Sequence, residues 1–419
     1  MNVSGETLAE ILAEPVDGRH KSFPVAPGVT VGTVGAQGWP ALGGPFGMPL
    51  LTLSRSAIEH NLAVMAEFCT TTGVELWPHG KTHLSAQLWR RQQAAGAAGV
   101  TVATAWQARV FAAAGAERIL VANEVADPAD LALLRELADA GVELVLTADS
   151  RAGVDALAAA FAGAAPPGVL VELGYEGGRA GVRTETDAVA LAEHVVASAS
   201  LRFAGIEGYE GVMPVDDRQA RADAVRRYLE RARGLVERIR PLVEASTPGA
   251  EPIASFGGSS YFDLVAGAFA PDTRVIIRSG CTLTHDHGSY AASTPFDGEQ
   301  GRPRLRAAFM LWARVLSRPE PGLAIVGFGR RDAPYDSGLP VLLERRGDAG
   351  VPASPTPAGV VTGLNDQHAY LRVPDDSDLA VGDALGFGIS HPCTAFDKWR
   401  LIPEVDDAGV VVDAVRTAF

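Results

Sequence analysis

The sequence predicts an α/β protein built from a (β/α)8 TIM barrel and a second, C-terminal, mostly β domain. Eight short apolar runs alternate with helical patterns between about residue 74 and Gly280. Parallel strands need such crossovers, and eight strands are enough to close a barrel. After Gly280, loops rich in Pro, Gly and Asp separate short alternating stretches, as in a compact β domain. A doubly wound sheet is the alternative, and the lack of a G-x-G-x-x-G motif after the first run disfavours it.

The eight apolar runs are expected to form the barrel strands. They span residues 74–78, 99–104, 119–123, 142–147, 169–173, 203–207, 252–256 and 275–278. Helical patterns lie between them, for example at 106–114, 128–140, 186–199 and 216–245. In the longest pattern, apolar residues recur every three or four positions, which predicts one buried stripe on a helix with a charged outer face. Asp216 and Asp217 are suited to cap its amino end.

The same changes in texture divide the chain into three segments. Residues 1–45 are punctuated by Pro and Gly, and we expect this N-terminal segment to pack with the β domain. Residues 46–285 are expected to form the barrel, and residues 286–419 the C-terminal β domain. No internal repeat is evident beyond the βα unit.

Composition and charge exclude several classes of function. With 47% hydrophobic and 21% charged residues, the sequence is typical of a soluble globular protein. A net charge of −14 disfavours partners such as nucleic acid and anionic membranes, whose phosphates would be repelled. We expect a cytoplasmic protein, because no apolar run approaches a membrane span and the first residues do not form a secretory signal. Of three cysteines, Cys69 and Cys281 are interpreted as small apolar residues.

The segment 78–83 (Pro-His-Gly-Lys-Thr-His) is the strongest chemical signal. Only three of the 36 basic Lys and Arg residues are lysines, and Lys81 lies between two histidines just after the first predicted strand. A lysine amine can lose its proton and form a Schiff base, whereas a guanidinium stays protonated. Lys81 is therefore a candidate catalytic residue, and a solvated basic loop is the alternative interpretation.

Two glycine-rich turns after later strands are candidate anion sites. Residues Gly257, Gly258, Ser259 and Ser260 lie between the seventh strand and a helical segment, where backbone NH groups and hydroxyls suit a phosphate. The alternative is a strand-to-helix turn capped by serine. Arg179 lies in a Gly-Gly-Arg-Ala-Gly turn after the fifth strand, where its guanidinium could meet an anion or a ring heteroatom. The alternative is a surface arginine.

His391 and Cys393 are candidate metal ligands. They follow an apolar run at 381–389, and in an extended segment residues i and i+2 point to the same face. An imidazole and a thiolate suit a borderline cation such as zinc, and two ligands leave positions open for catalysis. The alternative is a core histidine beside a buried cysteine, and His368 is a possible partner of the site.

Several separated motifs resemble the D-serine dehydratase and D-threonine aldolase family, pyridoxal-phosphate enzymes of the alanine racemase fold type. The resemblance covers about residues 46 to 405. It rests on segments 78–83, 93–97, 99–104, 205–211, 257–260, 336–340, 381–383 and 391–394. Departures at Trp77, Leu84 and residues 365–370 lie near a plausible substrate pocket and concern the substrate more than the reaction.

The resemblance implies a role for each matching residue. Lys81 would bind the cofactor covalently and act as the base at the substrate α-carbon. Arg179 and Tyr209 would line the pyridine ring, and the phosphate would be held by Gly257, Gly258, Ser259, Ser260, Ser279 and Gly280. His391 and Cys393 would bind a divalent metal, expected to be Zn²⁺. The aldolase branch usually has aspartate in place of Cys393, so the cysteine favours dehydration.

The resemblance therefore implies a homodimeric lyase that converts a small amino acid, a β-hydroxy D-amino acid similar to D-serine, into a 2-oxo acid and ammonia. A D-threonine-type aldolase, which would release glycine and an aldehyde, is the first alternative. A non-catalytic pyridoxal-phosphate carrier is the second. A racemase is a weaker alternative, because it would not explain the His-x-Cys pair.

Overall fold

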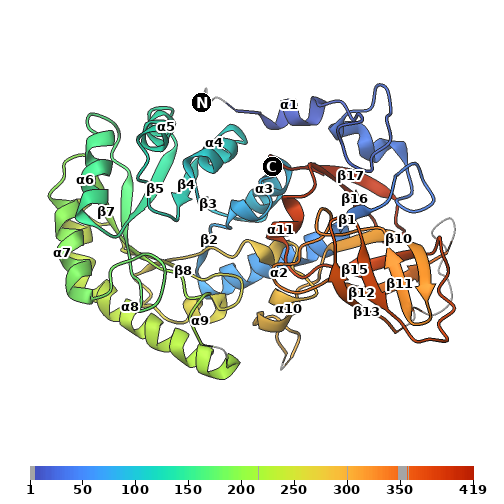
Figure 1. The fold of residues 1–419 in the computed structure, drawn as a ribbon. Coiled ribbons are helices and arrows are strands. Elements are labelled where there is room, and N and C mark those ends of the chain that lie inside the picture. Colours follow the sequence, from blue (N-terminus) through green and yellow to red (C-terminus); the bar gives the residue numbers. More distant parts are fainter. Residues whose placement is uncertain (1–4, 216, 300, 348–355, 357) are drawn as a thin grey trace. The chain divides into compact units, whose positions relative to one another are not determined.

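The protein was analysed as a computed structural model that describes residues 5–215, 217–299, 301–347, 356 and 358–419. The chain forms two compact units, whose elements are labelled in Figure 1. Unit 1 comprises the described part of Met1–Glu6 with Met65–Lys81 and Trp89–Gly280. Unit 2 comprises Thr7–Val64, Thr82–Leu88 and Cys281–Phe419. Helices α2 (Arg55–Thr72) and α3 (Ala86–Ala94) contain unit boundaries.

Unit 1 is built on a sheet of eight parallel strands. The strands are β2 (Glu75–Leu76), β3 (Val100–Val102), β4 (Arg118–Val121), β5 (Glu143–Ala148), β6 (Gly168–Glu172), β7 (Arg202–Glu207), β8 (Ile253–Phe256) and β9 (Arg274–Ile277). They pair in the order β2-β9-β8-β7-β6-β5-β4-β3. A parallel bridge between His79 and Thr101 joins the two ends of this order and closes the barrel. The predicted barrel is confirmed, and each strand coincides with one of the eight apolar runs.

Helices cover the outer face of the barrel sheet (Figure 1). They are α4 (Ala105–Ala113), α5 (Pro128–Asp139), α6 (Arg151–Ala160), α7 (Glu185–Val196), α8 (Arg218–Ser246) and the short α9 (Phe262–Ala266). Five begin at a residue whose side chain accepts a hydrogen bond from a first-turn amide, the usual N-cap: Thr104, Asp127, Ser150, Thr184 and Asp217. Residue 216, the other predicted cap, lies outside the described residues. The buried stripe of α8 includes Val225, Leu229 and Val236.

Side chains from the strands fill the barrel interior. Trp77, Leu120, Val145, Leu170, Ile253 and Ile276 form a buried cluster. Trp77 is fully buried, and its ring leaves no room for a side chain at Gly99, where a Cβ would lie 2.6 Å from the indole. The barrel interior around this cluster is therefore a packed apolar core. In barrels of this type, the residues that carry chemistry lie at the carboxyl ends of the strands.

Unit 2 is mostly β. Its sheet runs in the order β13-β14-β11-β10-β1-β16-β17, with β15 pairing to β10 and β12 pairing to β15. The strands are β1 (Leu50–Ser54), β10 (Phe309–Glu320), β11 (Leu323–Val326), β12 (Val341–Arg346), β13 (Val360–Leu364), β14 (Ala369–Arg372), β15 (Ala384–Gly388), β16 (Leu401–Val405) and β17 (Val411–Arg416). The expected C-terminal β domain is confirmed, with β1 from the N-terminal part of the chain at its centre.

The N-terminal segment contributes helix α1 (Leu8–Ala13) and the 3-10 helix η1 (Val31–Gln37) to unit 2. Val31, Val34 and Phe46 share a buried cluster with Trp312 and Val411. Among the described residues, no helix is long and apolar enough to cross a membrane.

A buried asparagine fixes the loop that begins the second half of unit 2. Asn61 of α2 is fully buried, and its Nδ2 donates to the carbonyls of Leu283 and Arg306 at 3.0 and 2.7 Å. Its Oδ1 accepts from the Arg306 amide at 2.8 Å. Because Leu283 ends the 3-10 helix η3 (Cys281–Leu283), these bonds hold that turn in place.

Candidate metal centre and barrel-mouth site

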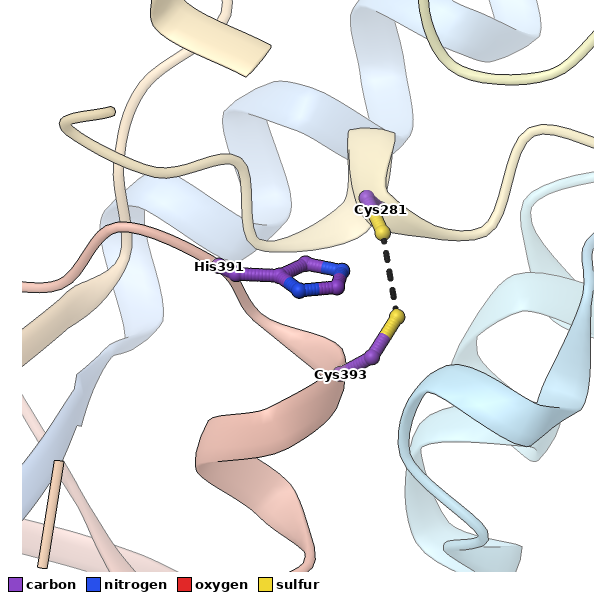
Figure 2. Close-up of side chains that lie close together, drawn as sticks. All are labelled: Cys281, His391 and Cys393. Carbon is purple, nitrogen blue, oxygen red and sulfur yellow. Dashed lines mark hydrogen bonds between the residues drawn. The ribbon is translucent and has the colours of Figure 1, made fainter. Parts of the chain in front are cut away.

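Three potential metal ligands converge in unit 2: Cys281, His391 and Cys393 (Figure 2). One ligand atom from each lies within 4.8 Å of the others, and the two sulfur atoms are 3.4 Å apart. Cys281 is buried in η3, while His391 and Cys393 come from the connection between β15 and the short helix α11 (Cys393–Phe396). The predicted pair therefore lies together, and a second thiol that sequence reasoning missed lies beside it.

The backbone of the predicted pair differs from the expected extended segment. Strand β15 ends at Gly388, and Pro392 has φ −64° and ψ −43°, which is helical. Proline fits the beginning of a helix because its fixed φ is helical and the missing NH would have no partner there. His391 and Cys393 therefore converge across the start of α11 instead of along one face of a strand.

An acidic residue orients the candidate imidazole ligand. His391 Nδ1 lies 2.5 Å from Asp336 Oδ2, and the other Asp336 oxygen accepts from Thr394 Oγ1 at 2.7 Å. A histidine that donates from Nδ1 to a carboxylate presents its Nε2 lone pair to a cation, an arrangement typical of metal sites. Asp336 takes the role that the sequence offered to His368, which is exposed.

The two thiols share their environment unequally. The hydrogen bond from Cys281, followed by the influence of His391, holds the pKa of the Cys393 thiol well below its usual range. The same contact, reinforced by burial, raises the pKa of Cys281. Burial opposes protonation of His391, but Cys393 and Asp336 outweigh it and raise the pKa of His391 to about 9. Thr82 Oγ1 lies 3.5 Å from Cys393 Sγ and 3.8 Å from Cys281 Sγ, so it contacts both sulfur atoms.

Lys81 lies in unit 1 in the 3-10 turn η2 (Gly80–Thr82), after β2, and its side chain is exposed. Two residues earlier, His79 Nδ1 is buried without a hydrogen-bond partner among the described residues. Burial, Lys81 and Arg278 together hold the pKa of His79 well below its usual range, so this imidazole is neutral at neutral pH. The turn thus combines the amine of Lys81 with a buried imidazole nitrogen that has no hydrogen-bond partner among the described residues.

The predicted cofactor residues after β6, β7, β8 and β9 lie together. The Arg179 guanidinium lies 5.2 Å from the Tyr209 ring centroid. The same ring packs on Gly258, where a Cβ would lie 2.8 Å from Tyr209 Cε2. Gly257 has φ +85°, a backbone conformation that residues with a side chain rarely adopt. Ser279 Oγ donates to the Gly258 carbonyl at 3.0 Å, so four predicted segments meet at one turn.

The amides of this turn already face an oxyanion. Gly257 and Gly258 donate from their backbone NH groups to the carboxylate of Glu210, at 3.2 and 2.7 Å. Glu210 is fully buried. The turn therefore has the donor geometry expected of an anion site, but in this structure a carboxylate of the chain occupies these two donors. Ser259 is buried and Ser260 half-buried in the same turn.

Sequence reasoning also missed a group of charged residues at the strand ends. Glu207 of β7 and Arg278, which follows β9, form a buried ion pair, and Arg278 Nη2 donates to the Gly208 carbonyl at 2.5 Å. Burial, followed by the charge of Glu207, raises the pKa of Glu172 at the end of β6 to about 10. Like Lys81, these residues lie at or just after the ends of predicted strands. That position in the sequence is the signal that could have pointed to them.

The comparisons with known proteins agree with this architecture. Residues 53–262 match the family described as "Alanine racemase, N-terminal domain", and residues 308–405 match "Putative serine dehydratase domain". The D-threo-3-hydroxyaspartate dehydratase of Delftia sp. (strain HT23) is 31% identical over 370 residues, covering 82% of this chain and 90% of that protein. The D-threonine aldolase of Arthrobacter sp. is 29% identical over 369 residues, covering 87% and 90%.

Solved structures show the same fold. The crystal structure of D-threonine aldolase from Filomicrobium marinum aligns with a TM-score of 0.77 and 27% identity, covering 91% of this chain and 97% of that one. A cysteine-to-alanine variant of a D-threo-3-hydroxyaspartate dehydratase, solved in the metal-free form, aligns with a TM-score of 0.71 and 23% identity, covering 89% of this chain and 97% of that one.

The barrel and the β unit thus define a two-part protein of the alanine racemase fold type. The chain belongs to the family that contains the D-threonine aldolases and the D-threo-3-hydroxyaspartate dehydratase.

The raised pKa of Glu172 generates a prediction about stability. Its pKa is about 10 in the fold against 4.5 ordinarily, so folding retains a proton that the unfolded chain loses as the pH rises. The favourable contribution of this group is complete below about pH 4.5 and is lost progressively up to about pH 10. We expect Glu172→Gln, a neutral replacement, to gain stability relative to the natural protein as the pH is raised from 5 to 9. Urea unfolding midpoints at several pH values measure this.

The matched control is Glu207→Gln on the neighbouring strand. It removes the partner of the buried Arg278 and should destabilise the protein by about 3–5 kcal/mol at neutral pH. Equal losses of stability in the two variants would show that Glu172 is ionised in the fold.

Proposed function

We propose that the protein is a pyridoxal-phosphate- and metal-dependent lyase that removes water from a β-hydroxy D-amino acid and yields a 2-oxo acid and ammonia. The observation that carries the proposal is the convergence of His391 and Cys393, with Asp336 on the imidazole, in a chain of the aldolase and dehydratase family. The cysteine favours dehydration, since the aldolase branch resembled by this sequence usually has aspartate at that position.

The residues of the barrel mouth fit the cofactor. Lys81 supplies an amine at the carboxyl end of β2. Two residues before it lies His79, whose buried Nδ1 has no hydrogen-bond partner among the described residues. Gly258 places no side chain against Tyr209, and the neighbouring amides are arranged around an oxyanion. We assign the ring to Arg179 and Tyr209, and the phosphate to the turn at 257–260 with Ser279 and Gly280. When bound, pyridoxal phosphate would supply an electron sink for a substrate carbanion.

Lys81 is assigned two tasks that its amine can perform. It would hold the cofactor covalently, and its free amine would accept the proton from the substrate α-carbon. His79 is neutral at neutral pH, so it adds no positive charge beside this amine. A guanidinium at the same position could do neither.

The metal ligands supply the second requirement of dehydration. Hydroxide is a poor leaving group, and a divalent cation held by His391 and Cys393 would supply Lewis-acid stabilisation for its departure. A hydrogen bond from His391 Nδ1 to Asp336 would leave the other ring nitrogen as the ligand atom. The donor set of nitrogen and sulfur suits Zn²⁺.

The aldolase reaction is the second candidate, and the comparisons favour it specifically. Proteins named 3-hydroxy-D-aspartate aldolase and D-threonine aldolase are both 29% identical to this chain over most of its length. The same site would serve, with loss of the hydroxyl proton and cleavage between Cα and Cβ. A non-catalytic carrier is a third candidate that the candidate metal centre disfavours.

Product analysis distinguishes the candidates. The reconstituted protein, incubated with zinc and D-threonine or D-threo-3-hydroxyaspartate, is expected to release ammonia with 2-oxobutanoate or oxaloacetate. Removal of the metal by a chelator should lower the rate by about 100-fold or more, because the leaving hydroxide would lose several kcal/mol of Lewis-acid stabilisation. Mass spectrometry identifies the products, and the L-enantiomers serve as controls. Glycine with acetaldehyde or glyoxylate would establish the aldolase, and no turnover of any β-hydroxy amino acid would favour the carrier.

The cofactor assignment predicts that Lys81→Ala abolishes covalent attachment. The variant should lose the visible absorbance of the lysine-bound cofactor, and activity should fall by about 10²–10⁴-fold because the base is also lost. Borohydride reduction followed by peptide mapping should label position 81 in the natural protein. Lys398→Ala, which changes one of the two other lysines, is the control and should keep the absorbance. Label on any other lysine would contradict the assignment.

A second prediction concerns the contact between Gly258 and Tyr209. In Gly258→Ala the new methyl group would lie 2.8 Å from the tyrosine ring, so the ring must move. We expect pyridoxal-phosphate affinity to fall by about 10- to 100-fold while the fold is retained. Gly267→Ala, at the end of α9, is the control, because a Cβ there meets nothing within 4 Å. Absorbance titrations of the two variants give the affinities, and equal values would remove Tyr209 from the cofactor site.

A further inference from the structure

We propose that Cys281 is a third metal ligand, which makes the centre a Cys₂His site with one coordination position left for the substrate. This inference rests on the proposed function only for the presence of a metal at His391 and Cys393. It adds a ligand distant in sequence from that pair, and it specifies the chemical class of cation that the site selects.

The distances fit a tetrahedral ion. With zinc-to-sulfur distances of about 2.3 Å and zinc-to-nitrogen distances of about 2.0–2.1 Å, neighbouring ligand atoms in a tetrahedron lie about 3.5–3.8 Å apart. The two sulfur atoms are 3.4 Å apart, and the three ligand atoms lie within 4.8 Å of one another. These separations are close to those of a tetrahedral set, so the geometry is that of three side chains around one ion.

The surroundings of Cys281 are those of a ligand more than those of a core cysteine. Its thiol contacts the sulfur of Cys393 and the hydroxyl of Thr82 although the residue is only 4% exposed. An apolar filler would be expected to contact carbon atoms on all sides. The turn that carries Cys281 is held by the buried Asn61 through Leu283, which gives the sulfur a fixed position.

Charge and softness give the consequence for the metal. Two thiolates neutralise a divalent cation, and a neutral imidazole completes three protein ligands, the arrangement of catalytic zinc sites that keep a fourth position open. Thiolates select Zn²⁺, Cd²⁺ and Co²⁺ over Mg²⁺ and Mn²⁺, whose preferred ligands are oxygen atoms. The natural protein should therefore prefer thiophilic cations, and Cys281→Ser should weaken that preference.

A disulfide between Cys281 and Cys393 is the competing interpretation of the short sulfur contact. It would consume both thiolates and could not coexist with the proposed site. His391 lies in the same cluster, and Asp336 fixes its ring. This favours the metal, because a disulfide would involve only the two sulfur atoms and would not explain an oriented imidazole beside them.

X-ray absorption spectroscopy of the zinc-loaded full-length protein tests the inference without measuring activity. We expect two sulfur ligands at about 2.3 Å in the natural protein and one in Cys281→Ser. Cys69→Ser, which removes the third cysteine of the chain, is the matched control and should keep two. Competition with a chromogenic chelator should show that Cys281→Ser binds zinc more weakly than the natural protein. The loss should exceed the 10- to 100-fold that is typical of changing a residue that only orients a ligand.

The possible outcomes separate this inference from the proposed function. One sulfur with nitrogen in the natural protein would leave the His391 and Cys393 site standing and overturn the role of Cys281. Zinc bound without any sulfur would overturn both. Thiol titration of the unfolded, freshly purified protein should give three thiols, and a single thiol would establish the disulfide instead. The cobalt-loaded natural protein should show sulfur-to-cobalt absorption with the intensity of two thiolate ligands, a result that does not depend on the folding of any variant. In Cys281→Ser this absorption should fall by about half.

Discussion

The common direction of the strands in a closed parallel sheet is the constraint on which the barrel-mouth site depends. Because every strand ends at the same edge, residues that follow β2, β7, β8 and β9 are gathered there although the sequence separates them widely. Lys81, Tyr209, Gly257 and Arg278 occupy these positions. Arg278 then fixes the edge itself, since it binds the side chain of Glu207 and the carbonyl of Gly208. A single buried cation thus ties the end of β9 to the end of β7, on either side of β8 and of the turn that would receive an anion.

Unit 2 has no such rule, since its strands run in both directions and its candidate ligands lie in loops. Buried or oriented polar groups take over the positioning there. Asn61 satisfies three backbone groups around η3 and Asp336 fixes the imidazole of His391. Each anchor would leave unsatisfied partners if it moved, which makes the loop geometry costly to distort. The candidate metal ligands are therefore held in place by polar anchors, whereas the barrel-mouth residues are positioned by the strand ends.

The barrel could be predicted because its strands are short and apolar and its helices are amphipathic, so each element is visible in local sequence. The candidate pair His391 and Cys393 was visible because its members are two residues apart, although Pro392 places them on a helix start and not a strand. Cys281 could not be found in this way, because 112 positions separate it from Cys393 and only the fold brings the sulfurs together. Glu172 was passed over although it ends a predicted strand, because the local sequence shows the position of a glutamate but neither its burial nor its raised pKa.

Covalent connectivity links the two candidate sites more directly than packing could. Lys81 is the last residue of its segment in unit 1, and the next residue, Thr82, contacts both candidate thiol ligands within unit 2. Gly280, the end of the proposed phosphate segment, is likewise followed directly by Cys281. Consecutive Cα atoms are held about 3.8 Å apart, so neither pair can be separated by any movement of the chain. Lys81 and Thr82, like Gly280 and Cys281, therefore stay adjacent in every conformation of the chain, and this adjacency is the physical link between the two candidate sites.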